Sequence, residues 1–189
     1  SYQKITSLQT GVCKDVVNVV GQHSMKLVLP STEYEKSFRQ ALKELKKQPS
    51  LNETERGLLS RFESAENFAE FVKKLRGQAK GRYLPNGFVP STTYWLVDGK
   101  KFIGRVSIRH RLNTHLCRIG GHIGYVIRPS ERKKGYGTGI LKLALAKTRE
   151  LGIKKVLVTC GVDNIGSRRI IEANGGIFQV RRHGIHAIG

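Results

Sequence analysis

The sequence is poor in acidic residues, methionine, tryptophan and cysteine. Its 189 residues include 14 acidic side chains against 34 basic ones, with one methionine, one tryptophan and three cysteines. Cys13, Cys117 and Cys160 are odd in number and form no C-x-x-C pair, which argues against a disulfide framework and a zinc site and favours a reducing, cytoplasmic location. No apolar run reaches the roughly 20 residues that a membrane span needs, so we expect no membrane contact.

The excess positive charge lies in one part of the chain. The formal net charge is +20, and residues 77–189 carry 21 basic against 5 acidic side chains, whereas residues 31–76 carry 10 against 8. A ligand with several phosphates would explain part of this charge. Binding to nucleic acid or another polyanion is a weaker alternative, because the sequence contains no nucleic-acid motif and a basic face is commonly just solvated.

The stretch from Gly120 to Glu150 contains the strongest pattern. It predicts a strand over residues 122–128 ended by Pro129, then a basic glycine-rich loop, then a helix from about Gly137 with a broad apolar face. A glycine-rich turn at a helix start presents unpaired N–H groups and the positive end of the helix dipole. This stretch is therefore predicted to bind a phosphate-bearing anion.

The loop fits neither of the two common phosphate motifs. It lacks G-x-x-x-x-G-K-[ST], and Ile140 stands where a G-x-G-x-x-G fingerprint needs a small residue. Arg132, Gly135 and Gly137 instead form R-x-x-G-x-G. Together with the preceding I-G-Y-V-I-R-P strand and the segment 163–176 (DNIGSRRIIEANGG), this pattern resembles the GNAT superfamily of N-acetyltransferases, closest to a poorly characterised group of predicted bacterial acetyltransferases.

The resemblance runs from about residue 25 to residue 178 and implies a fold and an activity. The implied fold is α+β, layered, with a mixed and mostly antiparallel central sheet flanked by helices. The implied reaction is direct transfer of an acetyl group from acetyl-CoA, as co-substrate, to a primary amine of a small-molecule or peptide acceptor, without a metal. By the same resemblance the cofactor-binding residues are Tyr125, Val126, Ile127, Arg132, Lys133, Lys134, Gly135, Tyr136, Gly137, Thr138, Gly139, Asn164 and Ser167.

The catalytic residues follow the family pattern less well. His122 is the candidate general base, since it lies ten residues before Arg132, where many relatives place a Glu, and imidazole titrates in a suitable range. A hydrogen-bonded strand residue is the alternative for His122, and His110 and His115 are weaker base candidates. Ile171 occupies the position of the usual Tyr acid and cannot donate a proton. Cys160 could form an acyl enzyme, although a small buried apolar residue is the favoured interpretation.

The flanking regions predict the rest of one domain, residues 25–189. Residues 1–24 are interpreted as a non-native or disordered extension, with an extra strand around Val16–Val20 as the alternative, because the single methionine is Met25. A capping box at Thr32-x-x-Glu35 predicts a helix to Gln48, and a second helix is expected over residues 65–76. Strands are expected over residues 92–97 and 101–111, joined by an Asp98-Gly99 turn, with a possible bulge at Gly104 and Trp95 either in the core or in the acceptor pocket.

The chain end departs from the family pattern. After Gly176 only one strand, over residues 177–181, fits, so the C-terminal hairpin is expected to be incomplete and a sheet edge exposed. A second copy could cover that edge as a homodimer. The short C-terminal segment and Ile171, at the position of the usual Tyr acid, suggest an alternative function. The protein would then bind acyl-CoA with little catalytic activity.

Overall fold

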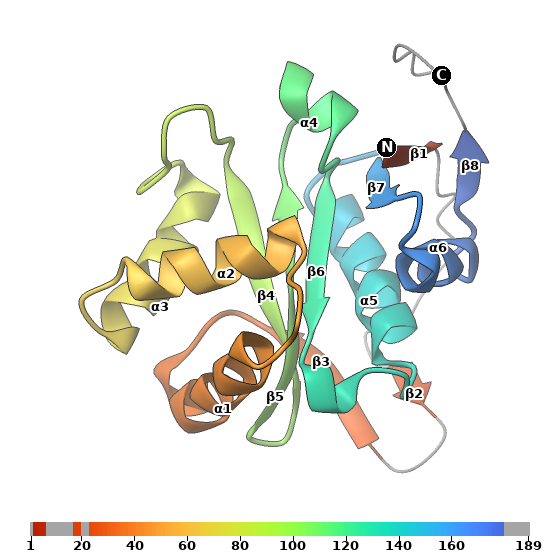
Figure 1. Ribbon diagram of the computed structural model, residues 1–189. Coiled ribbons are helices and arrows are strands. Elements are labelled where there is room, and N and C mark those ends of the chain that lie inside the picture. Colours follow the sequence, from red (N-terminus) through yellow and green to blue (C-terminus); the bar gives the residue numbers. More distant parts are fainter. Residues whose placement is uncertain (1, 7–16, 20–22, 180–189) are drawn as a thin grey trace.

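The computed structural model describes residues 2–6, 17–19 and 23–179, in which two antiparallel sheets lie between layers of helices (Figure 1). The strands are β1 Tyr2–Thr6, β2 Val17–Val19, β3 His23–Val28, β4 Ser91–Asp98, β5 Lys101–Arg109, β6 Ile123–Ile127, β7 Val158–Gly161 and β8 Ile177–Gln179. The α-helices are α1 Glu35–Lys46, α2 Glu53–Glu63, α3 Phe68–Gly77, α4 Thr114–Arg118, α5 Tyr136–Glu150 and α6 Ile165–Glu172. Three short 3-10 helices are η1 Thr32–Tyr34, η2 Gln78–Lys80 and η3 Pro129–Glu131.

The larger sheet has the strand order β2-β3-β4-β5-β6, with every neighbouring pair antiparallel. The bulge expected at Gly104 is confirmed, because the register shifts so that Leu96 faces Gly104 while Val97 faces Phe102. A Cβ at Gly104 would lie 2.5 Å from the backbone oxygen of Val126. Glycine therefore lets β5 and β6 approach closely at this point.

The smaller sheet has the order β7-β1-β8, so the strand nearest the N-terminus lies between two strands from the C-terminal part. β8 is the single C-terminal strand that the sequence predicted, and it pairs with β1, not with β7. Two parts of the segment interpreted as an extension are thus strands: β2 lies where the valines suggested one, and β1 was not predicted. Residues 1, 7–16, 20–22 and 180–189 lie outside the described part of the chain.

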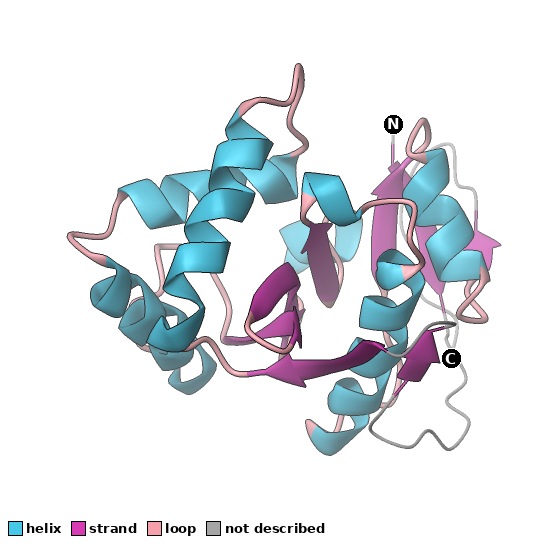
Figure 2. Ribbon diagram, turned by 90° about the horizontal axis from the view of Figure 1, so that it is seen from below, coloured by secondary structure: helices cyan, strands magenta, loops and turns pink. Residues whose placement is uncertain are grey.

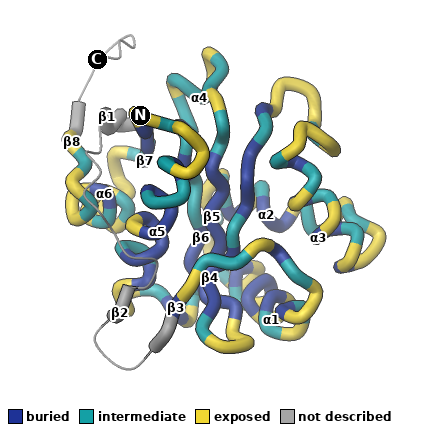
Figure 3. Tube along the Cα trace, turned by 180° about the vertical axis from the view of Figure 1, so that it is seen from behind, coloured by how far each residue is buried: buried dark blue, intermediate teal, exposed yellow. Residues whose placement is uncertain are grey.

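Helices cover both faces of the larger sheet (Figures 1 and 2). On one face α1, α2 and α3 pack an aromatic cluster in which Phe38 stacks on Trp95 with ring centroids 5.0 Å apart. On the other face Ile103, Val106 and Ile108 of β5 pack against α5. Figure 3 shows both layers as a buried centre surrounded by exposed loops. Trp95 is fully buried in this centre, so its core assignment is confirmed.

The structure corrects several predicted element boundaries. The Thr32-x-x-Glu35 capping box is wrong, because Ser31 caps η1 and the α-helix begins only at Glu35. The sequence did not predict α2, which opens with a capping box between Asn52 and Glu55, or the short helix α4. The remaining helices and the hairpin lie within a few residues of their predicted positions. The predicted fold class, an α+β arrangement of a mostly antiparallel sheet between helices, is confirmed.

Candidate active site

The site begins where β6 and β7 separate. The His122 N–H donates to the Leu157 carbonyl at 2.7 Å, and the Leu157 N–H donates to His122 Nδ1 at 3.0 Å. Gly121 makes this approach possible, since its φ is 58° and a Cβ there would lie 2.4 Å from the Leu157 oxygen. Past this point β6 and β7 belong to different sheets. Among the described residues β6 pairs only with β5, along one of its two edges. The other edge of β6 is free to bind a ligand through its backbone.

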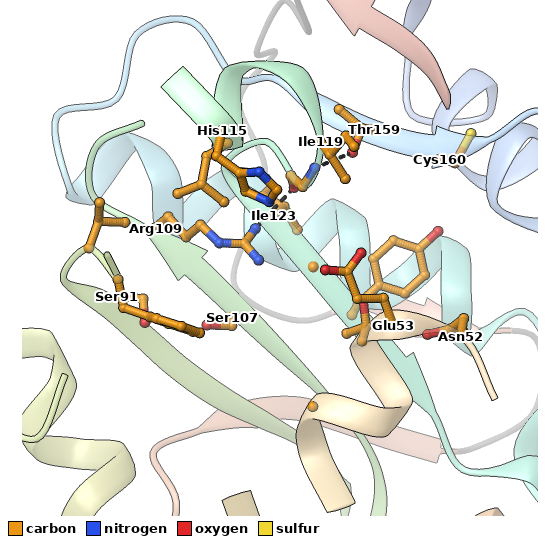
Figure 4. Close-up of a pocket in the computed structure, with 18 of the residues that line it drawn as sticks. Asn52, Glu53, Ser91, Ser107, Arg109, His115, Ile119, Ile123, Thr159 and Cys160 are labelled. Carbon is orange, nitrogen blue, oxygen red and sulfur yellow. Dashed lines mark hydrogen bonds between the residues drawn. The ribbon is translucent and has the colours of Figure 1, made fainter. Parts of the chain in front are cut away.

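A cavity of about 1180 Å³ opens beside this free edge. α2, β4, β5, β6, β7, α6 and the loops around α4 all contribute to its lining. Figure 4 shows the Glu53 carboxylate and the Arg109 guanidinium pointing into it from opposite sides, with His115 on the rim above Arg109 and Cys160 at the β7 side. The cavity therefore joins the gap between β6 and β7 to the space under α2.

The glycine-rich loop lies beyond the other end of β6 and leads into α5. Gly135 has a φ of 81° and is the N-cap of α5, and no side chain caps this helix. By contrast α2, α3, α4 and α6 each begin at an asparagine whose side chain accepts from the first turn. The first-turn N–H groups of α5 are consequently not satisfied by a capping side chain, which is the arrangement that an anion needs at a helix start.

The three basic side chains of this loop have different roles. Arg132 donates to Glu55 Oε1 at 2.6 Å and to the Ile127 carbonyl, so its guanidinium ties the loop to α2. Lys134 pairs with the buried carboxylate of Glu131 at 3.2 Å. Lys133 is exposed, has a φ of 63°, and makes no ion pair with any residue that the structure describes. Lys133 is thus the basic side chain of the loop that can meet a ligand.

The other predicted cofactor-binding residues divide into backbone, packing and cavity positions. The side chains of Val126, Ile127 and Tyr136 are buried in the cores, so a ligand could meet only their backbone. The alternation of the β5–β6 ladder turns the Val126 backbone toward β5, and the Ile127 carbonyl already accepts from Arg132. A Cβ at Gly137 would lie 2.5 Å from Ile170 Cδ1, and one at Gly139 would lie 2.4 Å from Met25 Cε. These two glycines therefore pack α5 closely against its neighbours. The Thr138 carbonyl accepts from the Asn174 side chain at 3.2 Å.

Asn164 and Ser167 both line the cavity, on the side of β7 and α6. Asn164 is the N-cap of α6, as the sequence predicted, and its Oδ1 accepts from the Ser167 N–H at 2.9 Å. Its Oδ1 is therefore occupied by the cap, while its amide and the Ser167 hydroxyl remain to contact a ligand.

His122 holds a structural position at the separation of the two strands. Its Nδ1 accepts a backbone hydrogen bond, so in the neutral ring the proton is on Nε2. Burial and the neighbouring charge of Arg109 lower the pKa of His122 below its ordinary value. His122 and His110 do not line the cavity, whereas His115 does. His110 instead shares a hydrogen bond of 2.8 Å with Thr92 Oγ1. The base role of His122 stays a prediction with a competing structural role.

Tyr125 and Cys160 face the cavity on its β6 and β7 sides. The Tyr125 hydroxyl is buried and has no hydrogen-bond partner among the described residues, although the Ser167 side chain lies near enough to influence it. Burial raises the pKa of Tyr125 to about 12, so the phenol stays protonated. Burial also raises the pKa of the Cys160 thiol, which keeps it un-ionised and poorly nucleophilic. Ile171 is fully buried in the core.

Sequence reasoning missed the charged residues on the α2 side of the cavity. Glu53 and Arg61 come from α2, the helix that was not predicted, and Arg105 and Arg109 come from β5. The available signal was the spacing Arg105-x-Ser107-x-Arg109, because alternate residues of a strand share one face. The N-x-x-E pattern at Asn52 was the corresponding signal for α2.

The three arginines repel one another. Burial and the charges of Arg61 and Arg109 lower the pKa of Arg105 to about 9, so it stays protonated at neutral pH. The pKa of Arg109 is lowered by burial and by Arg61, against the opposing effect of Glu53. Arg109 Nη1 donates to the Gly120 and Gly121 carbonyls at 3.0 and 2.9 Å. The cavity wall under α2 is therefore strongly positive.

Comparison with known proteins shows the family. Residues 36–177 match the family described as acetyltransferase (GNAT) domain. That match covers most of the chain, so the protein belongs to the GNAT acetyltransferases. Among solved structures, the microcin C7 self-immunity acetyltransferase MccE, determined in complex with acetyl-CoA and AMP, is similar with a TM-score of 0.49 and 14% identity, over 82% of this chain and 79% of that one. No curated protein sequence matches the chain significantly.

Within residues 2–6, 17–19 and 23–179, no group of three His, Cys, Asp or Glu side chains is placed to hold a metal ion. None of the helices in the same ranges is long and apolar enough to cross a bilayer.

Proposed function

We propose that the protein transfers the acetyl group of acetyl-CoA directly to a primary amine. The observation that carries this proposal is the free edge of β6, which runs from the cavity to the uncapped start of α5. A ligand with an amide-containing arm and a pyrophosphate would use both features at once. The family membership supports acetyl transfer in general.

The chain offers contacts for both parts of such a co-substrate. Of the predicted residues Tyr125, Val126 and Ile127, Tyr125 and the Ile127 N–H lie on the free edge and would pair with the pantetheine arm, as a third strand pairs with a free sheet edge, whereas the Val126 backbone faces β5. The N–H groups of residues 134–138 and the Lys133 ammonium would hold the pyrophosphate, while the Gly139 N–H donates to the Gly135 carbonyl. The Asn164 amide and the Ser167 hydroxyl lie on the opposite wall of the cavity.

The side chains in the cavity favour direct transfer. The un-ionised Cys160 thiol is a poor acyl acceptor, so the amine nitrogen attacks the thioester carbon itself, forming the C–N bond as the C–S bond breaks. The Tyr125 phenol, with its raised pKa, can donate a hydrogen bond to the departing thiolate and keep its own proton. The ammonium proton must leave before attack. His122 stays the candidate base, but it would act through water and only after releasing the Leu157 N–H, because its Nδ1 accepts that hydrogen bond, its Nε2 carries the proton, and it does not line the cavity.

A second candidate function is that of an acyl-CoA-binding protein with little transfer activity. The complete burial of Ile171 favours it, since no proton donor can reach the thiolate from that position. The two functions differ in what an added amine does. An enzyme releases CoA faster in the presence of an acceptor amine, whereas a binding protein does not.

Calorimetric titration of acetyl-CoA tests the binding half of the proposal. We expect Lys133→Glu to weaken binding, because it places a negative charge beside the pyrophosphate, while the matched control Lys142→Glu leaves it unchanged. Lys142 is exposed on α5, the helix that follows the loop of Lys133, and both substitutions change the net charge by the same amount. Lys133 is a better probe than the glycines, because a side chain at Gly135 would strain its positive φ and one at Gly137 would meet Ile170. Equal binding by both variants would place the pyrophosphate away from Lys133, and no binding by the unaltered protein would contradict the acetyltransferase proposal.

A further inference from the structure

The cavity holds a buried positive charge that no residue balances. Arg105 is 4% exposed, and its Nε and Nη1 atoms are buried without a hydrogen-bond partner in the described part of the chain. It lines the cavity together with Arg61 and Arg109, whose like charges lower its pKa further. A buried guanidinium is costly unless it is paired.

The other buried arginine among the described residues is paired. Arg128 donates from Nε and Nη2 to Glu44 Oε1 at 2.8 and 2.6 Å, and the partly exposed Arg132 donates to Glu55 at 2.6 Å. Glu53, the acidic residue that faces Arg109 in Figure 4, makes no ion pair within the described ranges. Arg105 therefore lacks the carboxylate partner that the buried Arg128 has, and its charge lies inside the cavity.

Arg105 lies beside the strand proposed to bind the co-substrate, so its charge is placed to meet the acceptor. Arg105 lies opposite Val126 in the β5–β6 ladder, so it is next to the strand whose free edge is assigned to the co-substrate. Arg61 approaches from α2 and lies over the Phe88 ring at 5.3 Å. Ser107, between Arg105 and Arg109 on the same face of β5, adds a hydroxyl to the wall. These groups are hydrogen-bond donors, and the planar guanidinium matches the two oxygens of an oxyanion.

We propose that the amine acceptor carries an oxyanion, a carboxylate or a phosphate, which binds Arg105 with support from Arg61. This inference rests on the proposed acetyl transfer and specifies its substrate class. The acceptor's amine points toward the gap between β6 and β7, and its oxyanion points under α2. The net charge of +20 would also attract an anionic acceptor toward the cavity.

Anion binding tests the inference without any reaction. Thermal unfolding is followed with succinate or inorganic phosphate added at constant ionic strength, against chloride. We expect a rise in Tm for the unaltered protein and for the control Arg111→Met, and a clearly smaller rise for Arg105→Met, in which only the start of α5 remains to bind the anion. Arg111 is exposed and lies outside the cavity, so the control removes the same charge. Arg105→Met is expected to fold, because replacing an unpaired buried charge by an apolar side chain is commonly tolerated. Arg105→Lys and Arg61→Met provide second variants.

Paired acceptors then test selectivity and separate the two oxyanions. The peptide amides Gly-Glu-NH2 and Gly-Gln-NH2 share one amine and differ in a carboxylate, and Gly-phosphoserine-NH2 and Gly-Ser-NH2 differ in a phosphate. We expect the anionic member of a pair to have the higher kcat/KM. In Arg105→Met its KM should rise about 10- to 100-fold, the range for one charged hydrogen-bonded contact, while the neutral member is unaffected.

The outcomes distinguish this inference from the proposed function. Acetyl-CoA binding with no anion-induced shift and no preference within the pairs would overturn the inference and leave the acetyltransferase proposal intact. If the anion-induced rise in Tm depends on Arg105 but the unaltered protein does not bind acetyl-CoA, the anion site stands and the acetyltransferase proposal is overturned. Loss of acetyl-CoA binding in Arg105→Met would assign the arginine to the co-substrate and so also overturn the inference.

Discussion

His122 has two separable roles that one pair of substitutions distinguishes. His122→Asn keeps an oxygen near the Nδ1 position, which can still accept the Leu157 N–H, but the amide cannot take up a proton. His122→Ala removes both functions. If His122 is the base, both variants lose about 10²- to 10⁴-fold in kcat at neutral pH, the usual contribution of general base catalysis. If it only joins the strands, the asparagine variant retains activity and the alanine variant loses stability, as measured by urea unfolding.

The lowered pKa of His122 also predicts a pH dependence of stability. The unfolded chain, with a pKa near 6.5, binds the proton more readily than the folded chain, so the free energy of unfolding falls as the pH drops below about 6.5. His110 contributes in the same direction. Denaturant unfolding between pH 7.5 and 5 should show this loss, and His122→Asn should flatten it. A stability that rises toward pH 5 would contradict the folded-state environment described for His122.

Tyr125 tests the leaving-group side of the reaction. Because its hydroxyl lacks a partner in the described structure, Tyr125→Phe should leave stability within about 1 kcal/mol of the unaltered protein. If the hydroxyl hydrogen-bonds the departing thiolate, kcat should fall about tenfold or more with acetyl-CoA binding nearly unchanged. Steady-state kinetics beside calorimetry would separate the two effects. An unchanged kcat would remove Tyr125 from the proposed chemistry.

At the scale of elements, the loop before α5 is fixed to the helices of the opposite layer. Glu44 of α1 accepts from Arg128 and from the Ser130 N–H at 3.1 Å, and hydrogen bonds from these groups lower its pKa against the opposing effect of burial. Glu55 of α2 accepts from Arg132. The helices that shape the acceptor side thus also position the loop assigned to the pyrophosphate.

Removing Glu44 should therefore destabilise the fold more than removing a surface carboxylate. Glu44→Ala leaves the nearly buried Arg128 uncompensated and is expected to cost about 3 kcal/mol. Glu35→Ala, on the same helix, breaks an exposed pair with Arg39 and should cost less than about 1 kcal/mol. Equal losses in chemical denaturation would show that Glu44 does not hold the loop.

The sequence predicted elements wherever periodicity and turn chemistry agreed. The strand–loop–helix around β6 and α5 has proline and glycine at its corners, and the β4–β5 hairpin has Asp98-Gly99, so both were placed closely. α2 was missed because its apolar positions Leu58, Leu59 and Phe62 are few among charged residues, although Asn52 caps it. The pairing of β1 between β7 and β8 joins the two ends of the chain, and no local pattern can show such a long-range contact.

The candidate site was predictable only in part, for a related reason. The proposed cofactor-binding residues lie in contiguous motifs, whereas the part of the cavity proposed for the acceptor combines α2, β4, β5 and α4. Arg61 and Arg105 are 44 positions apart in sequence, and their common cavity depends on the folded arrangement. Individual arginines in a chain with 34 basic residues carry no signal of burial. The folded structure singles out Arg105, because its Nε and Nη1 atoms are buried without a hydrogen-bond partner among the described residues.

On the scale of the whole molecule, the sheet is divided into two parts with the cavity at the division. α5 and α6 lie with the smaller sheet on one side, and α1, α2 and α3 lie on the other (Figure 1). The co-substrate is proposed to bind at the division and the acceptor under α2, so the two would meet beside Tyr125. The positive charge of both regions suits two anionic ligands, one of them acetyl-CoA.

The most direct test of the central claim is the fate of a labelled acetyl group. Acetyl-CoA labelled in its acetyl carbon is incubated with the protein and a panel of amines, and the products are analysed by mass spectrometry before and after hydroxylamine, which cleaves esters and thioesters but not amides. Direct N-transfer predicts amine-dependent release of CoA and label in a hydroxylamine-resistant product. Label that stays in acetyl-CoA, that appears as acetate regardless of amine, or that accumulates on Cys160 would contradict it.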